Sequence, residues 1–254
     1  MTVLKETKMK ICVVQNESVR GDVQSNIGNH KKLVDLAVSD GAEIIIFPEL
    51  SLTGYEPEIA GELATDKDDS SLDALQEISD SKHVTIGVGL PTKSDKGVCI
   101  SMVLSHPHST RQLYSKAHLH ADEKPFFVNG QNPTSFIGET RVALAICYEI
   151  SVPKHAEDAS KSGAAVYVAS VAKFVSGIEK AADRLSEIAS KYSMPVLMSN
   201  CVGRADNSEC AGLTAVWNSE GMLVEQLDAT NEGLLILDTE TQEVIRRQYT
   251  PVSA

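Results

Sequence analysis

Residues 43–47 (EIIIF), followed at once by Pro48, decide the fold expected for this chain. Three isoleucines and a phenylalanine without polar alternation are typical of a strand buried on both faces. Upstream, residues 10–15 (KICVVQ) form another apolar run, and apolar side chains repeat at helical spacing from Gln24 until the turn at Gly41. The chain is therefore expected to open with a β-α-β unit.

Strands and helices continue to alternate downstream. Capping-box patterns at Ser70 with Asp73 and at Ser176 with Glu179 predict two helix starts, and Pro153 predicts a third. Apolar runs predict strands at residues 84–90, 97–104, 111–115, 142–147, 164–169, 194–200, 212–217, 222–226 and 234–238. Since the turn-rich segment SHPHST joins two of these runs, we expect local antiparallel pairing and mixed sheets.

These elements favour one domain over residues 1–254, because no linker rich in proline, glycine or serine divides the chain. An α/β helix-sheet-sheet-helix sandwich would bury the many apolar strands. Residues 1–8 are expected to form a flexible N-terminal extension. Residues 244–254 are expected to be a C-terminal tail that contributes to a subunit interface.

The composition is that of a folded globular chain, with 42% hydrophobic and 23% charged residues. Lysine and arginine number 23 against 35 acidic residues, so the net charge of −12 argues against nucleic acid as a partner. No apolar run suits a membrane span, and residues 1–10 do not suit a signal peptide, so we expect a cytoplasmic protein. The spacing of the five cysteines and seven histidines suits no zinc site, so no metal and no cofactor are expected.

Three segments place reactive groups directly after predicted strands. They are residues 47–55 (FPELSLTGY), 114–119 (YSKAHL) and 145–149 (AICYE). Brought to one edge of the sandwich, they would supply a carboxylate, an ammonium and a thiol. Such a set can perform nucleophilic acyl transfer. Cys147 in isolation would more often be a core residue, but its place at a strand end favours an exposed thiol.

In this order and at these distances, the three segments resemble the motifs of the nitrilase or carbon-nitrogen hydrolase superfamily. The similarity spans nearly the whole chain, from KICVVQ to AGLTAVWNSEGMLVEQ at residues 211–226. It implies a four-layer α-β-β-α sandwich with two mixed sheets. It also implies a catalytic Glu-Lys-Cys set, which falls on Glu49, Lys116 and Cys147.

The resemblance assigns roles that agree with the chemistry of these groups. A thiol attacks only as thiolate, so Glu49 would take the proton of Cys147 while Lys116 stabilises negative charge. The backbone N–H of Tyr148 would complete an oxyanion hole with Lys116. A further carboxylate after the lysine is expected at Glu123, although adjacent Asp122 is an alternative; it would orient Lys116 and bind the substrate amide.

Other residues are expected to support the site. Tyr55 shapes the turn after Glu49, and Phe127 and Ser170 are expected to line the substrate pocket. Glu149 could be an additional acid, but it is predicted to be structural and to bond backbone amides or Lys116. Where many relatives carry a Trp-Pro pair, this chain reads ASVAK at residues 169–173. For its lysine, Lys173, we expect solvation rather than contact with a substrate carboxylate.

The sequence therefore predicts a cysteine-dependent enzyme that cleaves a non-peptide C–N bond of a small amide to carboxylate and ammonia through a thioester. An N-carbamoyl amide hydrolase, a nitrilase and a non-catalytic binding protein of the same fold are alternatives. A thiol redox protein is a poorer alternative, because no second cysteine lies close to Cys147 in the sequence. The resemblance further implies a homodimer or a higher even oligomer.

Overall fold

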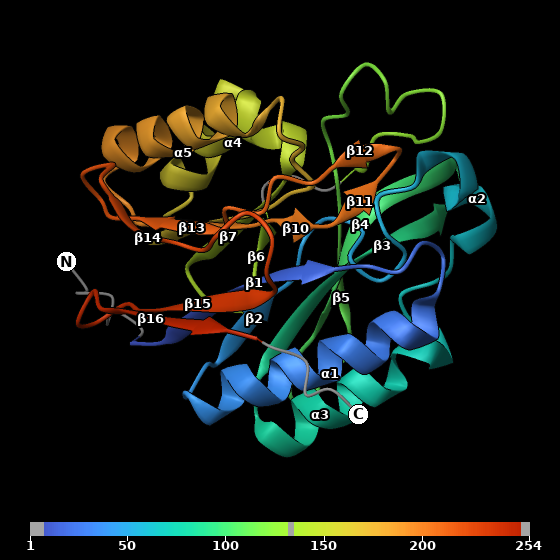
Figure 1. The fold of residues 1–254 in the computed structure, drawn as a ribbon, viewed down its shortest axis with the longest axis horizontal. Coiled ribbons are helices and arrows are strands. Elements are labelled where there is room, and N and C mark those ends of the chain that lie inside the picture. Colours follow the sequence, from blue (N-terminus) through green and yellow to red (C-terminus); the bar gives the residue numbers. More distant parts are fainter. Residues whose placement is uncertain (1–7, 132–134, 250–254) are drawn as a thin grey trace.

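A computed structural model describes residues 8–131 and 135–249. Two mixed sheets lie face to face, with helices on both outer sides (Figure 1). The helices are α1 (Val23–Ser39), α2 (Ala60–Leu63), α3 (Asp73–Lys82), α4 (Pro153–Lys161) and α5 (Ile178–Tyr192), with the short 3₁₀ helices η1 (Pro57–Ile59), η2 (Ser70–Leu72) and η3 (Cys147–Ser151). The four-layer α-β-β-α sandwich is confirmed.

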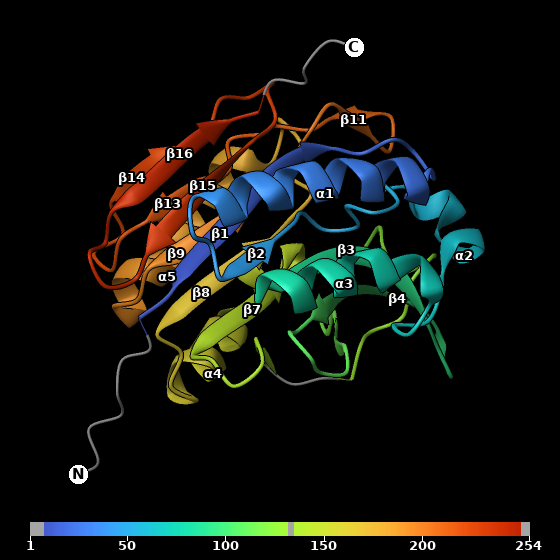
Figure 2. The ribbon, with the colours of Figure 1, turned by 90° about the horizontal axis from the view of Figure 1, so that it is seen from below.

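The first sheet contains the predicted β-α-β unit. Its strand order is β16 (Val244–Gln248), β15 (Gly233–Asp238), β1 (Lys10–Glu17), β2 (Ile44–Ile46), β3 (Thr85–Ser94), β4 (Gly97–Ser105) and β5 (Gln112–Ser115), and β10 (Cys201–Val202) also pairs with β1. The central strands β1, β2 and β3 run parallel, whereas β4, β15 and β16 pair antiparallel with their neighbours. Helices α1 and α3 cover the outer face of this sheet (Figure 2).

The second sheet repeats this plan with a parallel centre and antiparallel flanks. Its strand order is β14 (Leu223–Gln226), β13 (Ala215–Trp217), β9 (Val196–Ser199), β8 (Val166–Ser170), β7 (Val142–Ile146) and β6 (Ser135–Phe136). The central β7, β8 and β9 run parallel, and α4 and α5 cover the outer face. A small hairpin consists of β11 (Arg204–Ala205) and β12 (Ser208–Glu209).

Alternating side chains explain why the strands of the first sheet are apolar throughout. On β1, Ile11 and Val13 face the core between the sheets, whereas Cys12 and Val14 face the core beneath α1 and α3. Each buried aliphatic side chain contributes about 1.5–3 kcal/mol relative to its exposed state. The continuous apolar runs are therefore the signature of strands that are covered on both faces.

The structure corrects several local predictions. Neither capping box forms: Asp69 accepts the bond from Ser71 N at the start of η2, and Gly177 precedes α5 without a side-chain cap. Residues 244–248, which we assigned to a C-terminal tail, form β16, because their backbone pairs antiparallel with β15. Of the tail, residues 250–254 lie outside the described residues, as do residues 1–7 of the predicted N-terminal extension.

The parallel strands place the reactive segments at one edge of the sandwich. Glu49 follows β2, Cys147 follows β7, and Lys116 follows β5. Since β4 is antiparallel to both β3 and β5, β5 runs in the same direction as β2 and β3. The carboxyl ends of the strands therefore bring residues that are far apart in sequence to a common site.

Candidate active site

The carboxylate of Glu49 is fixed by a turn packed against β3. The turn begins at Phe47, whose N–H donates to the Gly87 carbonyl at 2.9 Å and whose carbonyl accepts from Ser170 Oγ at 2.8 Å. A Cβ atom on Gly89 would lie 2.3 Å from the backbone nitrogen of Leu50, so the turn approaches β3 too closely for any larger residue. Backbone contacts rather than side-chain packing alone thus position Glu49.

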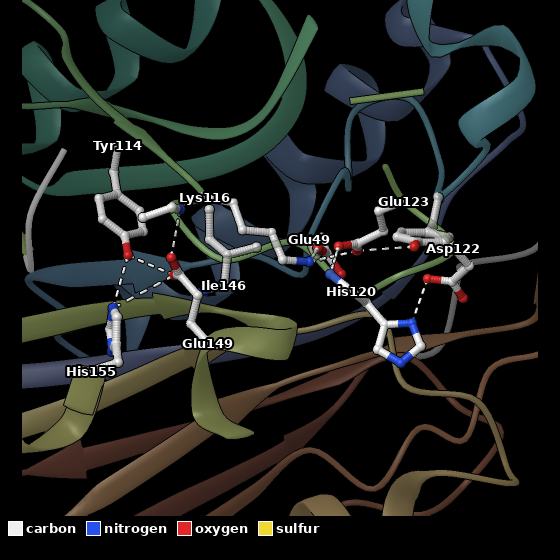
Figure 3. A network of polar contacts seen from close by, with 11 residues as sticks. Glu49, Tyr114, Lys116, His120, Asp122, Glu123, Ile146, Glu149 and His155 are labelled. Carbon is white, nitrogen blue, oxygen red and sulfur yellow. Dashed lines mark hydrogen bonds and ion pairs between the residues drawn. The ribbon is translucent and has the colours of Figure 1, made fainter. Parts of the chain in front are cut away.

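Lys116 lies at the centre of a buried cluster of charges. Its ammonium nitrogen lies 2.7 Å from Glu49 Oε1 and 2.6 Å from Glu123 Oε1, and its side chain has no exposed surface. Figure 3 shows the lysine pointing between the two carboxylates. Tyr55 adds a hydrogen bond from its hydroxyl to Glu123 Oε1 at 3.1 Å. Such dense pairing satisfies a buried cation that would otherwise be strongly destabilising.

Cys147 adopts a left-handed backbone conformation at the junction of β7 and η3. Its φ angle is +43°, a region that residues other than glycine rarely occupy. Strained backbone of this kind concentrates at functional sites, where the surrounding structure has to hold it in place. The turn places the thiol at the carboxyl edge of β7, but Cys147 is buried, so the expectation of an exposed thiol is wrong.

Glu149 holds this strained turn against the lysine segment. Its Oε2 accepts bonds from Ile146 N at 2.8 Å and from the Tyr114 hydroxyl at 2.6 Å, while Oε1 accepts from Ala117 N at 2.7 Å. His155 lies 3.0 Å from the same tyrosine hydroxyl (Figure 3). The prediction that Glu149 bonds backbone amides is confirmed, and the residue connects both sides of the site.

Burial and charge set the ionisation of the three central groups. Burial alone would lower the pKa of Lys116, but the charges of Glu49, Cys147 and Glu123 raise it above its usual value. Burial raises the pKa of Glu49, against the opposing effect of Lys116. Burial, aided by Glu49, raises the pKa of Cys147 to about 11. Burial therefore favours the neutral thiol of Cys147 in the free site, beside the carboxyl group of Glu49.

The second oxygen of Glu49 is available for that proton. Within residues 8–131 and 135–249, Oε2 is buried without a hydrogen bond of regular geometry. The Cys147 side chain interacts with this carboxyl group and lowers its pKa, as does the hydrogen bond from Lys116. Glu49 is thus paired with the ammonium through Oε1 and keeps an acceptor for the thiol.

Of the residues expected to support the site, some contact the charge cluster around Lys116 and others do not. Glu123 contacts Lys116, whereas Asp122 is exposed and pairs with His120. Phe127 is buried in the core between the sheets, and its backbone N–H donates to the Glu123 carbonyl at 2.9 Å.

Ser170 and Tyr148 also lie near the catalytic turns. The hydroxyl of Ser170 is bonded to the Phe47 carbonyl, so it braces the Glu49 turn and does not line an open pocket. Tyr148 follows Cys147 in η3, and its ring contacts that of His120 edge-on.

Lys173 is the functional side chain that the sequence interpretation missed. We expected it to be solvated, but it is partly buried and its charge interacts most strongly with Cys147, which raises the lysine pKa. Asn200, which directly follows the next parallel strand β9, accepts a hydrogen bond from the Lys173 N–H at 2.7 Å. The sequence did contain a signal for this position. Lys173 follows a predicted strand that is adjacent and parallel to the strand before Cys147, so both residues lie at the same edge of the sheet.

Metal-binding clusters and membrane-spanning helices are both absent from residues 8–131 and 135–249. No group of three or more histidine, cysteine, aspartate or glutamate side chains in those ranges is arranged to hold a metal ion. None of the helices found there has the length and apolarity needed to cross a membrane.

Comparisons with known proteins agree with this geometry. The family model for carbon-nitrogen hydrolase matches residues 10–249. "Hydrolase in agr operon" from Staphylococcus aureus is 26% identical over 254 residues and covers 96% of each chain. An (R)-stereoselective amidase from a Pseudomonas species is 26% identical over 165 residues, which is 63% of this chain and 59% of the amidase.

Solved structures of an amidase from Nesterenkonia sp. AN1 share the fold. One carries the acetamide moiety of fluoroacetamide at its active-site cysteine and matches with a TM-score of 0.82 at 22% identity, covering 94% of this chain and 93% of that chain. Another, a variant in complex with butyramide, matches with a TM-score of 0.80 at 22% identity and the same coverage of the two chains.

The chain belongs to the carbon-nitrogen hydrolase family, and it is an enzyme of that class. This confirms the resemblance drawn from the three sequence segments.

Proposed function

We propose that the enzyme hydrolyses the C–N bond of a small linear amide to a carboxylate and ammonia, with Cys147 as nucleophile. The observation that carries this proposal is the convergence of Glu49, Lys116 and Cys147 at one buried edge. There, Glu49 is bonded to Lys116 through one oxygen and keeps the other for the thiol proton.

In the first half-reaction, the Cys147 sulfur attacks the amide carbon while its proton passes to Glu49. A C–S bond forms, and the carbonyl oxygen becomes an oxyanion that Lys116 and the Tyr148 backbone N–H stabilise. Removing one such donor typically slows acyl transfer by about 10²–10³. Glu49 then protonates the departing nitrogen, so the C–N bond breaks and ammonia leaves a thioester.

In the second half-reaction, Glu49 removes a proton from water and the resulting hydroxide adds to the thioester carbon. The C–S bond breaks, the carboxylic acid departs, and Glu49 returns its proton to the sulfur. Glu49 therefore acts in turn as base, acid and base. Burial raises the pKa of Glu49, which favours proton uptake by this carboxyl group compared with an exposed glutamate.

The choice of an amide is supported by the relatives. The Nesterenkonia amidase structures contain butyramide or an adduct from fluoroacetamide, and the Pseudomonas relative is an amidase. An N-carbamoyl compound and a nitrile are the competing substrate classes, and a relative from Pyrococcus abyssi is a nitrilase. An ω-amide of a dicarboxylic acid and a simple aliphatic amide are both included in the proposal.

Ammonia release from the purified protein tests the proposal. The wild type and Cys147→Ala are incubated with aliphatic amides, ω-amides, N-carbamoyl compounds and nitriles. We expect release from at least one amide by the wild type and none by Cys147→Ala. Equal release by both proteins would overturn the cysteine mechanism, and release from nitriles or carbamoyl compounds alone would overturn the substrate class.

A non-catalytic binding protein is the main competing function. The enzyme and the binding protein are distinguished by mass spectrometry of the protein mixed at low temperature with each amide of the ammonia-release assay. An enzyme accumulates an acyl adduct on Cys147, whereas a binding protein forms none.

A homodimer and a cytoplasmic location stay predictions. Light scattering at micromolar protein concentration checks the first, and a monomeric mass would contradict it. Cell fractionation checks the second.

A further inference from the structure

Lys173 and Cys147 leave their strands side by side. Ser170, the last residue of β8, pairs in parallel register with Ile146, the last residue of β7. Cys147 follows one residue after this pair and Lys173 three residues after it. The intervening Val171 and Ala172 are buried, and the charge of Lys173 interacts with Cys147. The two side chains therefore leave neighbouring parallel strands at the same edge of the sheet, with the ammonium in electrostatic reach of the sulfur that would attack the substrate.

The backbone of Lys173 is held on both sides. Its N–H donates to Asn200 Oδ1 at 2.7 Å, and its carbonyl accepts from Asn200 Nδ2 at 3.2 Å and from Ala211 N at 2.8 Å. Asn200 is fully buried and is itself fixed by a bond from Nδ2 to the Gly212 carbonyl at 2.7 Å. Because a clamped backbone limits the reach of the side chain, the ammonium stays close to the cysteine.

The two carboxylates near Cys147 are matched by two ammonium groups only when Lys173 is counted with Lys116. The groups that act on Cys147 are the carboxylates Glu49 and Glu123 and the ammonium groups Lys116 and Lys173, with Tyr55 beside them. Lys116 forms ion pairs with both carboxylates. Lys173 forms an ion pair with no carboxylate of the described residues, so its charge is available to the sulfur.

We propose that Lys173 is a further catalytic residue of this site, whose ammonium stabilises negative charge on the Cys147 sulfur. It acts when the thiol proton moves to Glu49 and the C–S bond forms, and again when the C–S bond of the thioester breaks and the thiolate leaves. No proton is transferred to or from Lys173 in either step. The part of this inference that concerns the reaction rests on the proposed function. The effect of Lys173 on the ionisation of the Cys147 thiol does not.

The ionisation of the two groups agrees with this role. Burial and the charge of Glu49 raise the pKa of Cys147, and Lys173 opposes them more strongly than Lys116 does. In return, the charge of Cys147 raises the pKa of Lys173 against the effect of burial. Lys173 is therefore protonated throughout the range in which the enzyme would work.

Alkylation of the cysteine by iodoacetamide tests the inference without any substrate. The reagent is neutral and reacts with thiolate, so its rate reports the thiolate fraction. The rate of adduct formation is followed by intact mass from pH 7 to pH 10, with the Cys147→Ala protein as background. The variants are Lys173→Met, Lys173→Arg and, as a matched control, Lys180→Met, which removes an exposed charge from α5.

We expect alkylation of Lys173→Met to fall about tenfold at each pH, since one unit of thiol pKa changes the thiolate fraction by that factor. Lys173→Arg should recover most of the rate, because it keeps the charge, and Lys180→Met should match the wild type. An unchanged rate in a folded Lys173→Met protein would overturn the inference. So would a loss of activity confined to amides that carry a carboxylate, with alkylation unchanged, because Lys173 would then bind substrate.

The two proposals fail in different ways. If the wild type releases no ammonia from any amide but its alkylation depends on Lys173, the proposed function is wrong and the role of Lys173 at the thiol stands. Thermal unfolding of each variant checks its folded fraction, because an unfolded fraction would expose the thiol and raise the alkylation rate.

Discussion

Glu149 accepts a hydrogen bond from the backbone N–H of Ala117 at 2.7 Å, and this contact links the two halves of the candidate site. Ala117 follows Lys116 of the charge cluster, and Glu149 lies two residues after Cys147, the proposed nucleophile. The same carboxylate holds the Ile146 N–H before the strained turn. One buried side chain thus fixes the spacing between the segments that carry the cation and the thiol.

Substituting Glu149→Gln should slow turnover with little change in KM. The amide nitrogen of glutamine would face backbone N–H donors, and loss of a charge-assisted hydrogen bond costs about 1.5–3 kcal/mol. We expect kcat to fall about tenfold to a hundredfold, since 1.4 kcal/mol is a factor of ten. Steady-state kinetics and thermal unfolding check this, with Glu157→Gln on the exposed face of α4 as control. A raised KM at normal kcat would contradict a positioning role.

Substituting Glu49→Gln should abolish turnover and make the free energy of unfolding less dependent on pH. Burial raises the pKa of Glu49, so the charged form is less favourable in the folded than in the unfolded protein. Stability is therefore lost as the pH rises from the unfolded pKa through the raised folded pKa, and the glutamine variant avoids this loss. In thermal unfolding, the stability of the variant relative to the wild type should be higher at pH 8 than at pH 5. The reverse order would refute the assigned direction of the shift.

Adding a methyl group at Gly89 should disturb the catalytic carboxylate. The Cβ atom of Gly89→Ala would lie 2.3 Å from Leu50 N and 2.7 Å from the Pro48 carbonyl oxygen, so the Glu49 turn must move. Overpacking of this kind costs about 1–3 kcal/mol. We expect lower stability and at least tenfold lower kcat.

The control for that variant is Gly28→Ala on α1, where nothing lies within 4 Å of the added atom. It should leave activity intact and raise stability by about 0.5–1 kcal/mol, because alanine favours helix. Equal behaviour of the two variants in denaturant unfolding and kinetics would contradict the close contact at Gly89.

Removing the Ser170 hydroxyl should affect stability more than substrate binding. Ser170→Ala leaves the buried Phe47 carbonyl without its side-chain donor, at a cost of about 1–3 kcal/mol. We expect a lower midpoint in urea and an unchanged KM. A clear rise in KM at unchanged stability would instead assign the hydroxyl to the substrate.

The sequence alone determined the sandwich and the catalytic motifs, because both depend on short-range information. Strands that are buried on both faces have continuous apolar runs, as in residues 43–47, and reactive residues directly after such strands reach the sheet edge. The order of the FPELSLTGY, YSKAHL and ICYE segments identified the family before any contact was known.

Tertiary structure decided what depends on partners distant in sequence. Glu123, which the sequence favoured with adjacent Asp122 as an alternative, contacts Lys116, whereas Asp122 faces solvent. Residues 244–248 became a strand because β15 offered an unpaired edge. Lys173 emerges beside Cys147 because β7 and β8 run parallel and Asn200 holds its backbone. Pairing between strands, which local propensity does not encode, set the last two of these outcomes.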